Sequence, residues 1–439
     1  MFLILKLNVL HKWRIFNSRI KFVVCLEGGC SIIWLMKNRV IERKEILHDI
    51  LKWKDGDLIK VITGVRRCGK STVLKMVESA LRELGVHDNC IAYIDFESRN
   101  YQGLTSKESV WEELDRQLTG IGKKYVLLDE VQRVPNFELL VDALYADKQY
   151  DCYLTGSNAW MLSGELATYL SGRYIEVHVT PLSFSEYLNG FDRHPIDAFV
   201  EYSNYGSFPY VRGIVEEGRE NDVGQYLEGI YNTVLMKDVA IRSKMSDAET
   251  INRIASYLFD NIGNLTNTKR ISDVLSSAGG KVSYPSVATY VKNLCDAFLF
   301  YKCERVDVKG LALLKTGAKY YSVDTGLRYW MNGNRAGDEG RVLENIVYLE
   351  LMRKHRNVYT VVTRSSSEID FVTRDGDDIR YYQVSESVKS PETLERELRP
   401  LKEIGDNYPK FLVTADYGKP VMHDGIRQIS IYDFLRQSS

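Results

Sequence analysis

Residues Gly64 to Ser71 place two glycines, a lysine and a hydroxyl at the spacing G-x-x-x-x-G-K-[ST]. Glycine tolerates the backbone angles that turn consecutive N–H groups inward around a phosphate. Lys70 would then reach the β and γ oxygens of a nucleotide as a point charge. Ser71 would offer its hydroxyl to Mg²⁺, which takes few protein ligands. The pattern therefore predicts binding of a nucleoside phosphate.

The segments on either side of this loop have the order that the motif needs. Leu58–Thr63 is an apolar run that predicts a buried strand entering the loop. Beyond the loop, apolar residues recur at helical spacing, at Val73, Leu74, Val77, Leu81 and Leu84. Because this helix would begin at the loop, its positive end would face the anion.

A second apolar strand, Tyr125–Leu128, ends in the acidic pair Asp129 and Glu130. A carboxylate at the end of such a strand can hold magnesium through water. We predict that Asp129 faces the metal and that Glu130 polarises the attacking water as a general base. Without the loop upstream, the same residues would indicate only a strand that ends in solvated acids.

Further strands complete a parallel α/β pattern. Tyr150–Thr155 runs into polar residues, of which Ser157 and Asn158 could sense the γ-phosphate. Ile91–Phe96 and Val177–Pro181 are also predicted strands, and apolar spacing over Phe137–Leu144 predicts an amphipathic helix between two of them. Strands that alternate with helices favour a parallel sheet. The chain lacks an Asn-Lys-x-Asp signature, which favours adenine over guanine.

Four motifs together resemble prokaryotic AAA-type ATP-binding proteins that carry a C-terminal domain of unknown function. They are the phosphate loop, Asp129–Arg133, Leu154–Ser157 and Leu170–Arg173, and the resemblance covers the chain from about Met36 onward. It implies ATP and Mg²⁺ as ligands, a sensor at Ser157 or Asn158, and Arg173 as an arginine finger, although a plain surface arginine is an equal alternative. The predicted nucleotide-binding residues are Gly64, Val65, Arg66, Arg67, Cys68, Gly69, Lys70, Ser71, Thr72, Asp129, Ser157 and Asn158.

Composition restricts the possible class of protein less strictly than the motifs do. The chain has 439 residues, 44% of them hydrophobic, which suggests two to three domains with real cores. Its formal net charge of −1 means that any contact with nucleic acid would use a local patch. The seven cysteines show no C-x-x-C pair or zinc spacing, so we expect reduced thiols in the cytoplasm and no structural metal beyond nucleotide-bound Mg²⁺.

The sequence divides into five predicted segments. Residues 1–35 contain apolar runs interrupted by charges, too short to span a membrane and unlike a signal peptide. We expect this segment to be a disordered extension, or a non-native one created by the choice of start codon. The predicted segments that follow are an AAA-type ATPase domain at 36–190, a helical lid at 191–260, a winged-helix region at 261–335 and a C-terminal domain at 336–439.

Two short helices followed by two strands predict the winged helix-turn-helix. The helices lie around Ile271–Leu275 and Val287–Leu294, and the strands at Phe298–Tyr301 and Lys319–Val323. If such a unit reads DNA, its recognition helix would present Ser286, Thr289 and Lys292. The same unit often binds only protein, so DNA and a protein partner both stay open.

In the C-terminal segment, Glu344 lies on a predicted helix, and Glu368 and Asp370 lie on the predicted strand that follows it. This helix–strand–strand order is similar to the restriction-endonuclease core, where acids on these elements bind a metal. The next strand carries Gln383-Val-Ser385 where an acid-x-lysine is expected, and Lys389 lies too far along to replace the lysine. We therefore predict a nuclease-like domain without cleavage activity.

These patterns leave three functions open. The leading hypothesis is a slow Mg²⁺-dependent ATPase that acts as a nucleotide-driven switch with partner-binding or DNA-binding modules. The alternatives are a DNA-processing enzyme with a nuclease-like head, and a scaffold that binds ATP without hydrolysis. Because an arginine finger acts on a neighbouring copy, a homo-oligomer is a further expectation. We predict no membrane partner.

Overall fold

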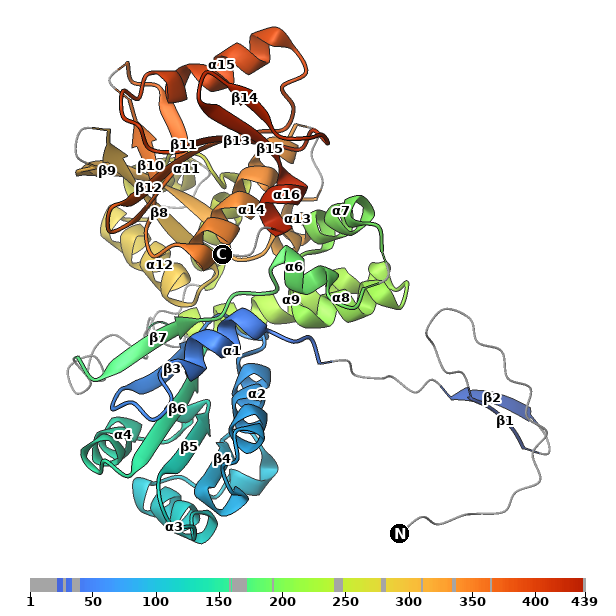
Figure 1. Ribbon diagram of the computed structural model, residues 1–439, viewed down its shortest axis with the longest axis vertical. Helices are drawn as coiled ribbons and strands as arrows, with labels where there is room; N and C mark the ends of the chain where they lie inside the picture. The colour runs from blue at the N-terminus through green and yellow to red at the C-terminus, as the bar shows by residue number, and fades with distance from the viewer. Residues whose placement is uncertain are drawn as a thin grey trace. The chain divides into compact units, whose positions relative to one another are not determined.

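Figure 1 shows the computed structural model, which describes residues 22–26, 29–33, 40–157, 159, 172–191, 193–240, 248–277, 282–308, 311–333, 337–363 and 365–436. The chain divides into two units, residues 1–41 and 42–439. The first unit contains an antiparallel pair of strands, β1 (Phe22–Leu26) and β2 (Gly29–Ile33). The expectation for residues 1–35 stays a prediction.

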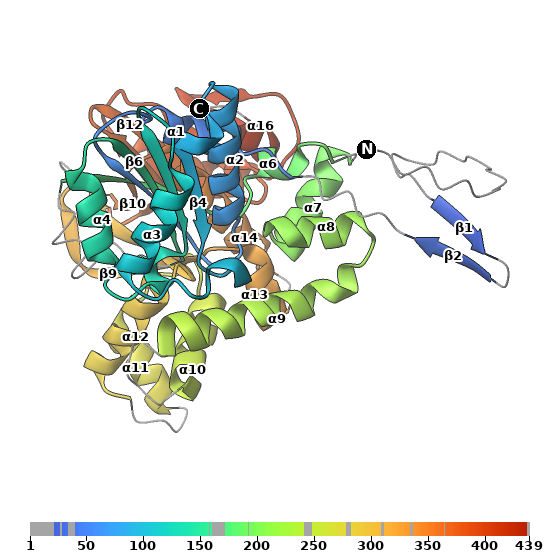
Figure 2. The ribbon, with the colours of Figure 1, turned by 90° about the horizontal axis from the view of Figure 1, so that it is seen from below.

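The second unit begins with a parallel sheet in the order β4-β5-β6-β3-β7. Its strands are β3 (Ile59–Thr63), β4 (Ile91–Asp95), β5 (Lys124–Asp129), β6 (Tyr150–Gly156) and β7 (Tyr174–His178). Helices α1 (Lys44–Leu51), α2 (Lys70–Glu83), α3 (Lys107–Gln117) and α4 (Phe137–Ala146) surround the sheet. Figures 1 and 2 place α2 on one face and α3 with α4 on the other. The prediction of a parallel α/β sheet is confirmed.

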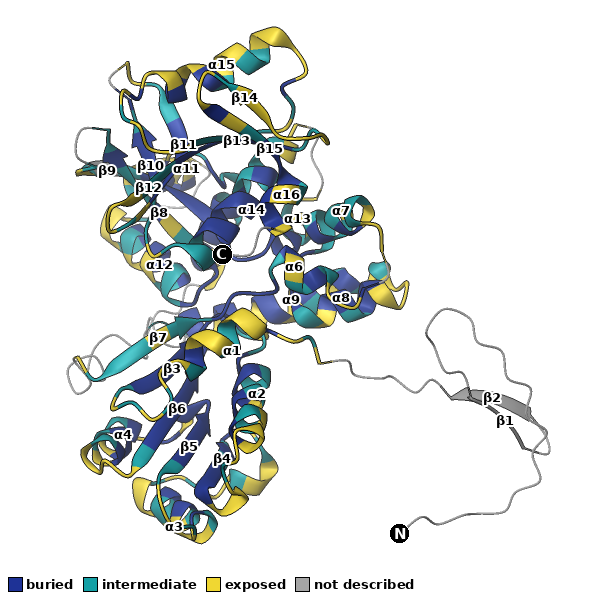
Figure 3. Ribbon diagram, in the orientation of Figure 1, coloured by how far each residue is buried: buried dark blue, intermediate teal, exposed yellow. Residues whose placement is uncertain are grey.

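The core of this sheet follows from its sequence pattern. Every residue of β3 is buried, as Figure 3 shows, because helices cover both faces of the sheet. Val61, Leu128 and Leu154 meet Leu140 of α4 in one apolar cluster. The last predicted strand is present, but its bounds were wrong, since β7 covers Tyr174–His178 rather than Val177–Pro181. It is a half-buried edge strand, and the apolar residues after it, such as Val179, are buried without being in a strand.

A helical segment follows the parallel sheet. It consists of α6 (Phe184–Leu188), α7 (Pro195–Tyr205), α8 (Pro209–Glu216), α9 (Val223–Thr233), the π-helical turn η6 (Val234–Ala240) and α10 (Ala248–Asp260). The α7–α8 junction fits closely against a later helix, α13 (Thr325–Asn332). A Cβ on Gly326 would lie 2.1 Å from the carbonyl oxygen of Tyr205, so only glycine fits there. Asp324, the N-cap of α13, accepts hydrogen bonds from the Ser207 amide at 2.6 Å and from its hydroxyl at 2.9 Å.

Both predicted helices of the next region are present, as α11 (Thr268–Ser277) and α12 (Tyr284–Asp296). They precede an antiparallel hairpin of β8 (Phe300–Asp307) and β9 (Leu313–Ser322). Thr266, just before α11, pairs with Ala318 of β9 through a single bridge.

The hairpin belongs to an eight-stranded sheet in the order β14-β15-β13-β12-β11-β10-β8-β9. Its other strands are β10 (Val358–Val362), β11 (Glu368–Asp375), β12 (Asp378–Ser385), β13 (Lys410–Thr414), β14 (Val421–His423) and β15 (Ile426–Ser430). Helices α14 (Glu339–Lys354), α15 (Pro391–Lys402) and α16 (Ile431–Arg436) pack against it. Because β8 pairs with β10, one sheet runs across the boundary predicted at residue 335.

Candidate ATP site

The phosphate loop joins β3 to α2 and has the backbone that its glycines allow. Gly64 and Gly69 have positive φ angles of 147° and 107°. A Cβ on Gly64 would lie 2.1 Å from the carbonyl oxygen of Val179, so the first glycine is also required by a close approach. Gly69 is the N-cap of α2, and the start of that helix has no side-chain cap hydrogen bond from the residues that the structure describes. The N–H groups of that turn are therefore available to an anion.

Lys70 lies inside the loop, with only 4% of its surface exposed. Its ammonium group donates to the carbonyl oxygens of Gly64 at 3.0 Å and of Val65 at 3.1 Å. It also lies 4.0 Å from Oε1 of Glu130. These are contacts that a phosphate could replace, since the lysine side chain can turn about its flexible stem.

The predicted acidic pair lies at the carboxyl end of β5. Asp129 is 1% exposed, and its carboxylate oxygens accept hydrogen bonds from the hydroxyls of Thr155 at 2.5 Å and Tyr93 at 3.0 Å. Burial, followed by the charge of Asp129, raises the pKa of Tyr93, so this phenol stays a donor. The carboxylate of Asp129 is thus held by two neutral groups, which suits a ligand for a cation.

Glu130 has an unusual backbone for a residue that is not glycine. Its φ is 57°, in the left-handed region. Its amide donates to Oγ1 of Thr155 at 2.8 Å, and its carboxylate accepts from the side-chain amide of Gln132. Such strain persists only where neighbouring groups enforce it, and it is common at active sites.

Ser157 follows β6 at the same edge of the sheet. Gly156 pairs in register with Thr63, the last residue before the phosphate loop, so Ser157 is close to the loop. Its side chain is 1% exposed, and its hydroxyl has no hydrogen-bond partner among the described residues. A buried hydroxyl without a partner is costly, which fits a group that a ligand satisfies. Asn158 lies outside the described residues.

Comparison with known proteins agrees with this geometry. The model of a family of AAA domains matches residues 57–188, and the model of a domain of unknown function (DUF8612) matches residues 196–338. An uncharacterized protein of Haemophilus influenzae is 38% identical over 408 residues, which is 92% of this chain and 100% of that protein. The chain belongs to the family of that protein. Its first large domain is an AAA-type P-loop domain.

One more distant relative and one solved structure complete the comparison. An uncharacterized protein of Methanocaldococcus jannaschii is 27% identical over 390 residues, which is 84% of this chain and 82% of that protein. The structure of a Walker-type ATPase of Pyrococcus abyssi has 15% identity and a TM-score of 0.47, and covers 67% of this chain and 97% of that one. A TM-score of this size carries no inference about function.

Arg173 lies away from the phosphate loop of its own AAA domain. Its carbonyl oxygen accepts from the amide of Ile59, at the start of β3, whereas the loop follows the end of that strand. The guanidinium group pairs with Asp142 at 2.6 Å and lies 5.1 Å from the ring centre of Tyr145. An action as arginine finger would therefore need a second copy of the chain, and the assignment stays a prediction.

The remaining predicted residues of the phosphate loop differ in how far they are buried. Val65 and Cys68 are fully buried, and burial raises the pKa of the Cys68 thiol. Arg67 is exposed, with a positive φ of 67°, and Arg66 pairs with an acid outside the AAA domain, Asp238 of η6. Ser71 and Thr72 are half-buried in the first turn of α2.

Sequence reasoning missed several residues that support the loop. Arg43 is 3% exposed and donates to the carbonyl oxygens of Cys68 at 3.1 Å and Thr180 at 2.9 Å, and also pairs with Glu186. Arg353 of α14 donates to the Thr180 hydroxyl at 2.8 Å. No spacing rule connects such distant positions. Thr155 and Tyr93 lay inside predicted strands. For these two residues, the signal in the sequence was a polar side chain near the end of an apolar strand.

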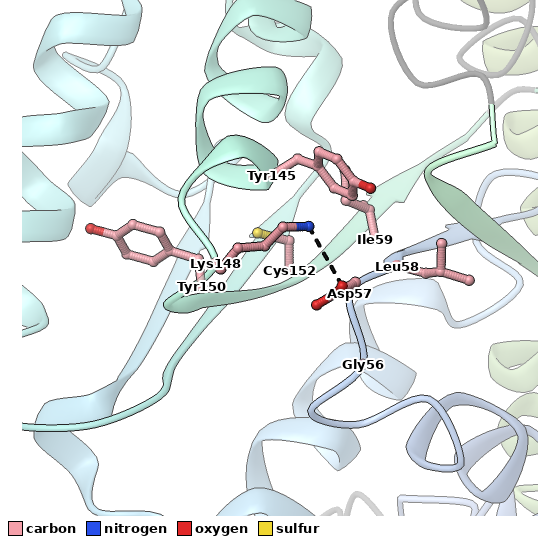
Figure 4. A pocket seen from close by; sticks show the side chains of 8 residues that line it. All are labelled: Gly56, Asp57, Leu58, Ile59, Tyr145, Lys148, Tyr150 and Cys152. Carbon is pink, nitrogen blue, oxygen red and sulfur yellow. Dashed lines mark ion pairs between the residues drawn. The ribbon is translucent and has the colours of Figure 1, made fainter.

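One small cavity among the described residues lies away from the phosphate loop. Figure 4 shows a cavity of about 10 Å³ near the starts of β3 and β6, which is the edge of the sheet opposite to the phosphate loop. Lys148 and Asp57 face each other there at 3.6 Å. This volume holds about one water molecule. The cavity is therefore too small to hold a nucleotide.

The predicted C-terminal acids do converge, around a lysine that sequence reasoning missed. The ammonium group of Lys319, on β9, lies 2.9 Å from Glu344, 2.7 Å from Glu368 and 3.6 Å from Asp370. Burial, and then the charge of Glu344, raise the pKa of Asp370. Gln383 lies on the strand where the nuclease pattern would have an acid-x-lysine. Its side-chain amide donates a hydrogen bond to Glu397 at 3.0 Å. Among the described residues, no group of three or more acids, histidines or cysteines is arranged to hold a metal.

No helix within the described ranges is long and apolar enough to cross a lipid bilayer.

Proposed function

We propose that the protein is a Mg²⁺-dependent ATPase that turns over slowly and acts as a nucleotide-driven switch. The observation that carries this proposal is that Lys70, Asp129 and Glu130 lie together at the carboxyl edge of one parallel sheet. Ser157 lies at the same edge, and its hydroxyl has no hydrogen-bond partner within the part of the chain that the structure describes. In open α/β sheets, ligands bind at that edge.

Each side chain has a defined task in this proposal. Lys70 binds the β and γ oxygens of ATP, and Ser71 and Asp129 hold Mg²⁺, which neutralises charge on the phosphates. Glu130 orients the attacking water and accepts its proton. Ser157 donates its hydroxyl to the γ-phosphate. Turnover is slow in a single copy because Arg173 of the same chain lies at the opposite end of β3 from the phosphate loop and pairs with Asp142.

The switch is supported by one ion pair between the loop and the helical segment. Arg66 donates to Asp238 from Nε at 2.6 Å and from Nη2 at 3.1 Å, and Asp238 is 3% exposed. Asp238 lies on the π-helical turn η6, a type of turn that is frequent at functional sites. A phosphate beside Arg66 would compete with Asp238 for the guanidinium group, so nucleotide binding would alter the position of η6.

Hydrogen exchange of residues 223–260 with and without ATP tests the switch. We expect ATP to change protection in the wild type, and Asp238→Asn to show the same protection with and without ATP. Glu228→Gln, an exposed acid on the neighbouring helix α9, is the matched control and should respond like the wild type. An equal ATP response in Asp238→Asn and Glu228→Gln would refute the switch through this pair.

The proposed partner module is a winged helix formed by α10, α11, α12 and the β8–β9 hairpin. The bridge between Thr266 and Ala318 supports it by placing a short extended segment beside the hairpin. On α12, Thr289 and Lys292 are exposed at helical spacing, and Lys292 pairs with Asp296 of the same helix at 2.5 Å. Turnover measured with and without duplex and single-stranded DNA distinguishes a DNA partner from a protein partner.

For the C-terminal domain we propose a restriction-endonuclease-like fold without cleavage activity. The ammonium group of Lys319 lies among the three acids, where it neutralises charge that a metal would otherwise neutralise. Purified protein with Mg²⁺ or Mn²⁺ should leave supercoiled and linear DNA intact. Metal-dependent cleavage that disappears in Asp370→Ala would instead favour the DNA-processing alternative.

A further inference from the structure

Two hydroxyl groups from neighbouring strands hold the carboxylate of Asp129 from both sides. β5 lies between β4, which carries Tyr93, and β6, which carries Thr155. Thr155 Oγ1 donates to Oδ1 of Asp129 at 2.5 Å, and Tyr93 Oη donates to Oδ2 at 3.0 Å. Each carboxylate oxygen has two acceptor sites, so each keeps one for a metal or its water. The two bonds therefore fix the carboxylate without blocking it.

Thr155 makes a second contact, with the other acid of the pair. Its Oγ1 accepts the amide hydrogen of Glu130 at 2.8 Å. The hydroxyl is fully buried, and it donates to one acid while it accepts from the next. The left-handed backbone of Glu130, with a φ of 57°, costs about 1–3 kcal/mol and needs such support. One side chain thus sets the direction of Asp129 and the backbone of Glu130.

We infer that Thr155 is a positioning residue for Mg²⁺-dependent hydrolysis, with Tyr93 as a second and weaker one; this inference rests on the proposed ATPase function. Neither residue touches the nucleotide in this account. Hydrogen bonds to a metal-binding carboxylate typically change metal affinity or activity by about 10- to 100-fold when they are removed. Loss of these hydrogen bonds should therefore change how ATP turnover depends on Mg²⁺ concentration, rather than weaken ATP binding in general.

Three variants separate this role from plain packing. Thr155→Val keeps the shape of the side chain but loses both hydrogen bonds, and Thr155→Ser restores the hydroxyl. Tyr93→Phe removes only the second bond to Asp129 and keeps the aromatic ring, so it tests the inference even if Thr155→Val does not fold. Thr373→Val, a fully buried threonine on β11, is the matched control for a lost buried hydroxyl outside the AAA domain.

The measurements are the Mg²⁺ concentration for half-maximal ATP turnover, and ATP affinity in the presence of a chelator. We expect Thr155→Val to raise the half-maximal Mg²⁺ concentration by about tenfold or more, with unchanged metal-free ATP affinity. Tyr93→Phe should shift it in the same direction by less. Thr155→Ser and Thr373→Val should match the wild type.

The outcomes separate the inference from the function on which it rests. A wild-type protein without Mg²⁺-dependent ATP turnover refutes the proposed function. An active wild type with an unchanged Mg²⁺ response in both Tyr93→Phe and folded Thr155→Val refutes only the positioning role. A lower melting temperature in Thr155→Val with a wild-type Mg²⁺ response also refutes it, since that result indicates packing alone.

Discussion

Replacing Lys319 by methionine should destabilise the C-terminal domain strongly. Methionine keeps the length of the side chain but removes a buried charge that is 4% exposed and contacts Glu344, Glu368 and Asp370. Removing one partner of a buried ion pair costs about 3–5 kcal/mol. Two features favour the lower end of this range. Burial raises the pKa of Asp370, so it is partly protonated, and Glu368 is 34% exposed. We therefore expect a loss of about 3 kcal/mol.

Urea unfolding at pH 7, followed by tryptophan fluorescence and circular dichroism, measures this loss. The matched control is Lys302→Met on β8, whose ammonium group pairs with Glu304 at 2.8 Å on the surface, with side-chain exposures of 49% and 43%. A surface pair of this kind contributes about 0–1 kcal/mol. The losses in unfolding free energy of the two variants should thus differ by more than the error of the measurement.

The pH dependence of the Lys319→Met variant gives a second check. A carboxyl group whose pKa is higher in the folded state destabilises the fold when it is ionised, and this cost falls as pH drops toward its unfolded pKa. Without Lys319, all three acids lose a stabilising cation. The deficit should therefore be largest above neutral pH and shrink by pH 5. Equal stability of Lys319→Met and Lys302→Met at pH 7, or a deficit that grows in acid, would refute this reasoning.

Three further predictions concern the AAA domain. Burial, and then the charges of Lys70 and Arg353, lower the pKa of His178 from 6.5 to about 4, so its stabilising effect is complete above pH 6.5 and is lost as pH falls through 4. Relative to His178→Gln, the wild type should lose about 3 kcal/mol of unfolding free energy by pH 4, and parallel denaturant midpoints would contradict this. Glu130→Gln should bind ATP normally but hydrolyse it about 100-fold more slowly in a turnover assay, and wild-type turnover would mean that another group positions the water. Arg173→Ala should reduce turnover more than ATP binding, and a fully active variant whose rate is independent of protein concentration would favour a plain surface arginine.

The sequence predicted the AAA domain well because its signals are local. The strand–loop–helix order around Gly64, the acidic end of β5 and the polar end of β6 each follow from a few adjacent residues. The edge strand β7 was misplaced because half-buried edge strands do not form an apolar run. In the C-terminal region, the acids were identified from their order, but their fold-level assignment remains a proposal.

Contacts between distant residues could not be predicted. Lys319 and Glu368 lie on strands that are not neighbours in the sheet, and nothing in either local pattern connects them. The same holds for Arg66 with Asp238 and for Arg43 with the phosphate loop. Such pairs depend on how whole helices and strands pack against each other. No short stretch of a single sequence contains that information.

The most direct test of the account is calorimetric titration of Mg²⁺ and ATP into the wild type and Lys70→Ala. Lys70 is the buried cation inside the phosphate loop, so its loss should weaken ATP binding at least tenfold, or about 1.4 kcal/mol. Lys75→Ala, an exposed lysine on the same helix, is the matched control and should bind like the wild type. We expect saturable ATP binding that depends on Lys70 and not on Lys75. No binding by the wild type, or equal affinity in Lys70→Ala, would contradict the assignment of an ATP site.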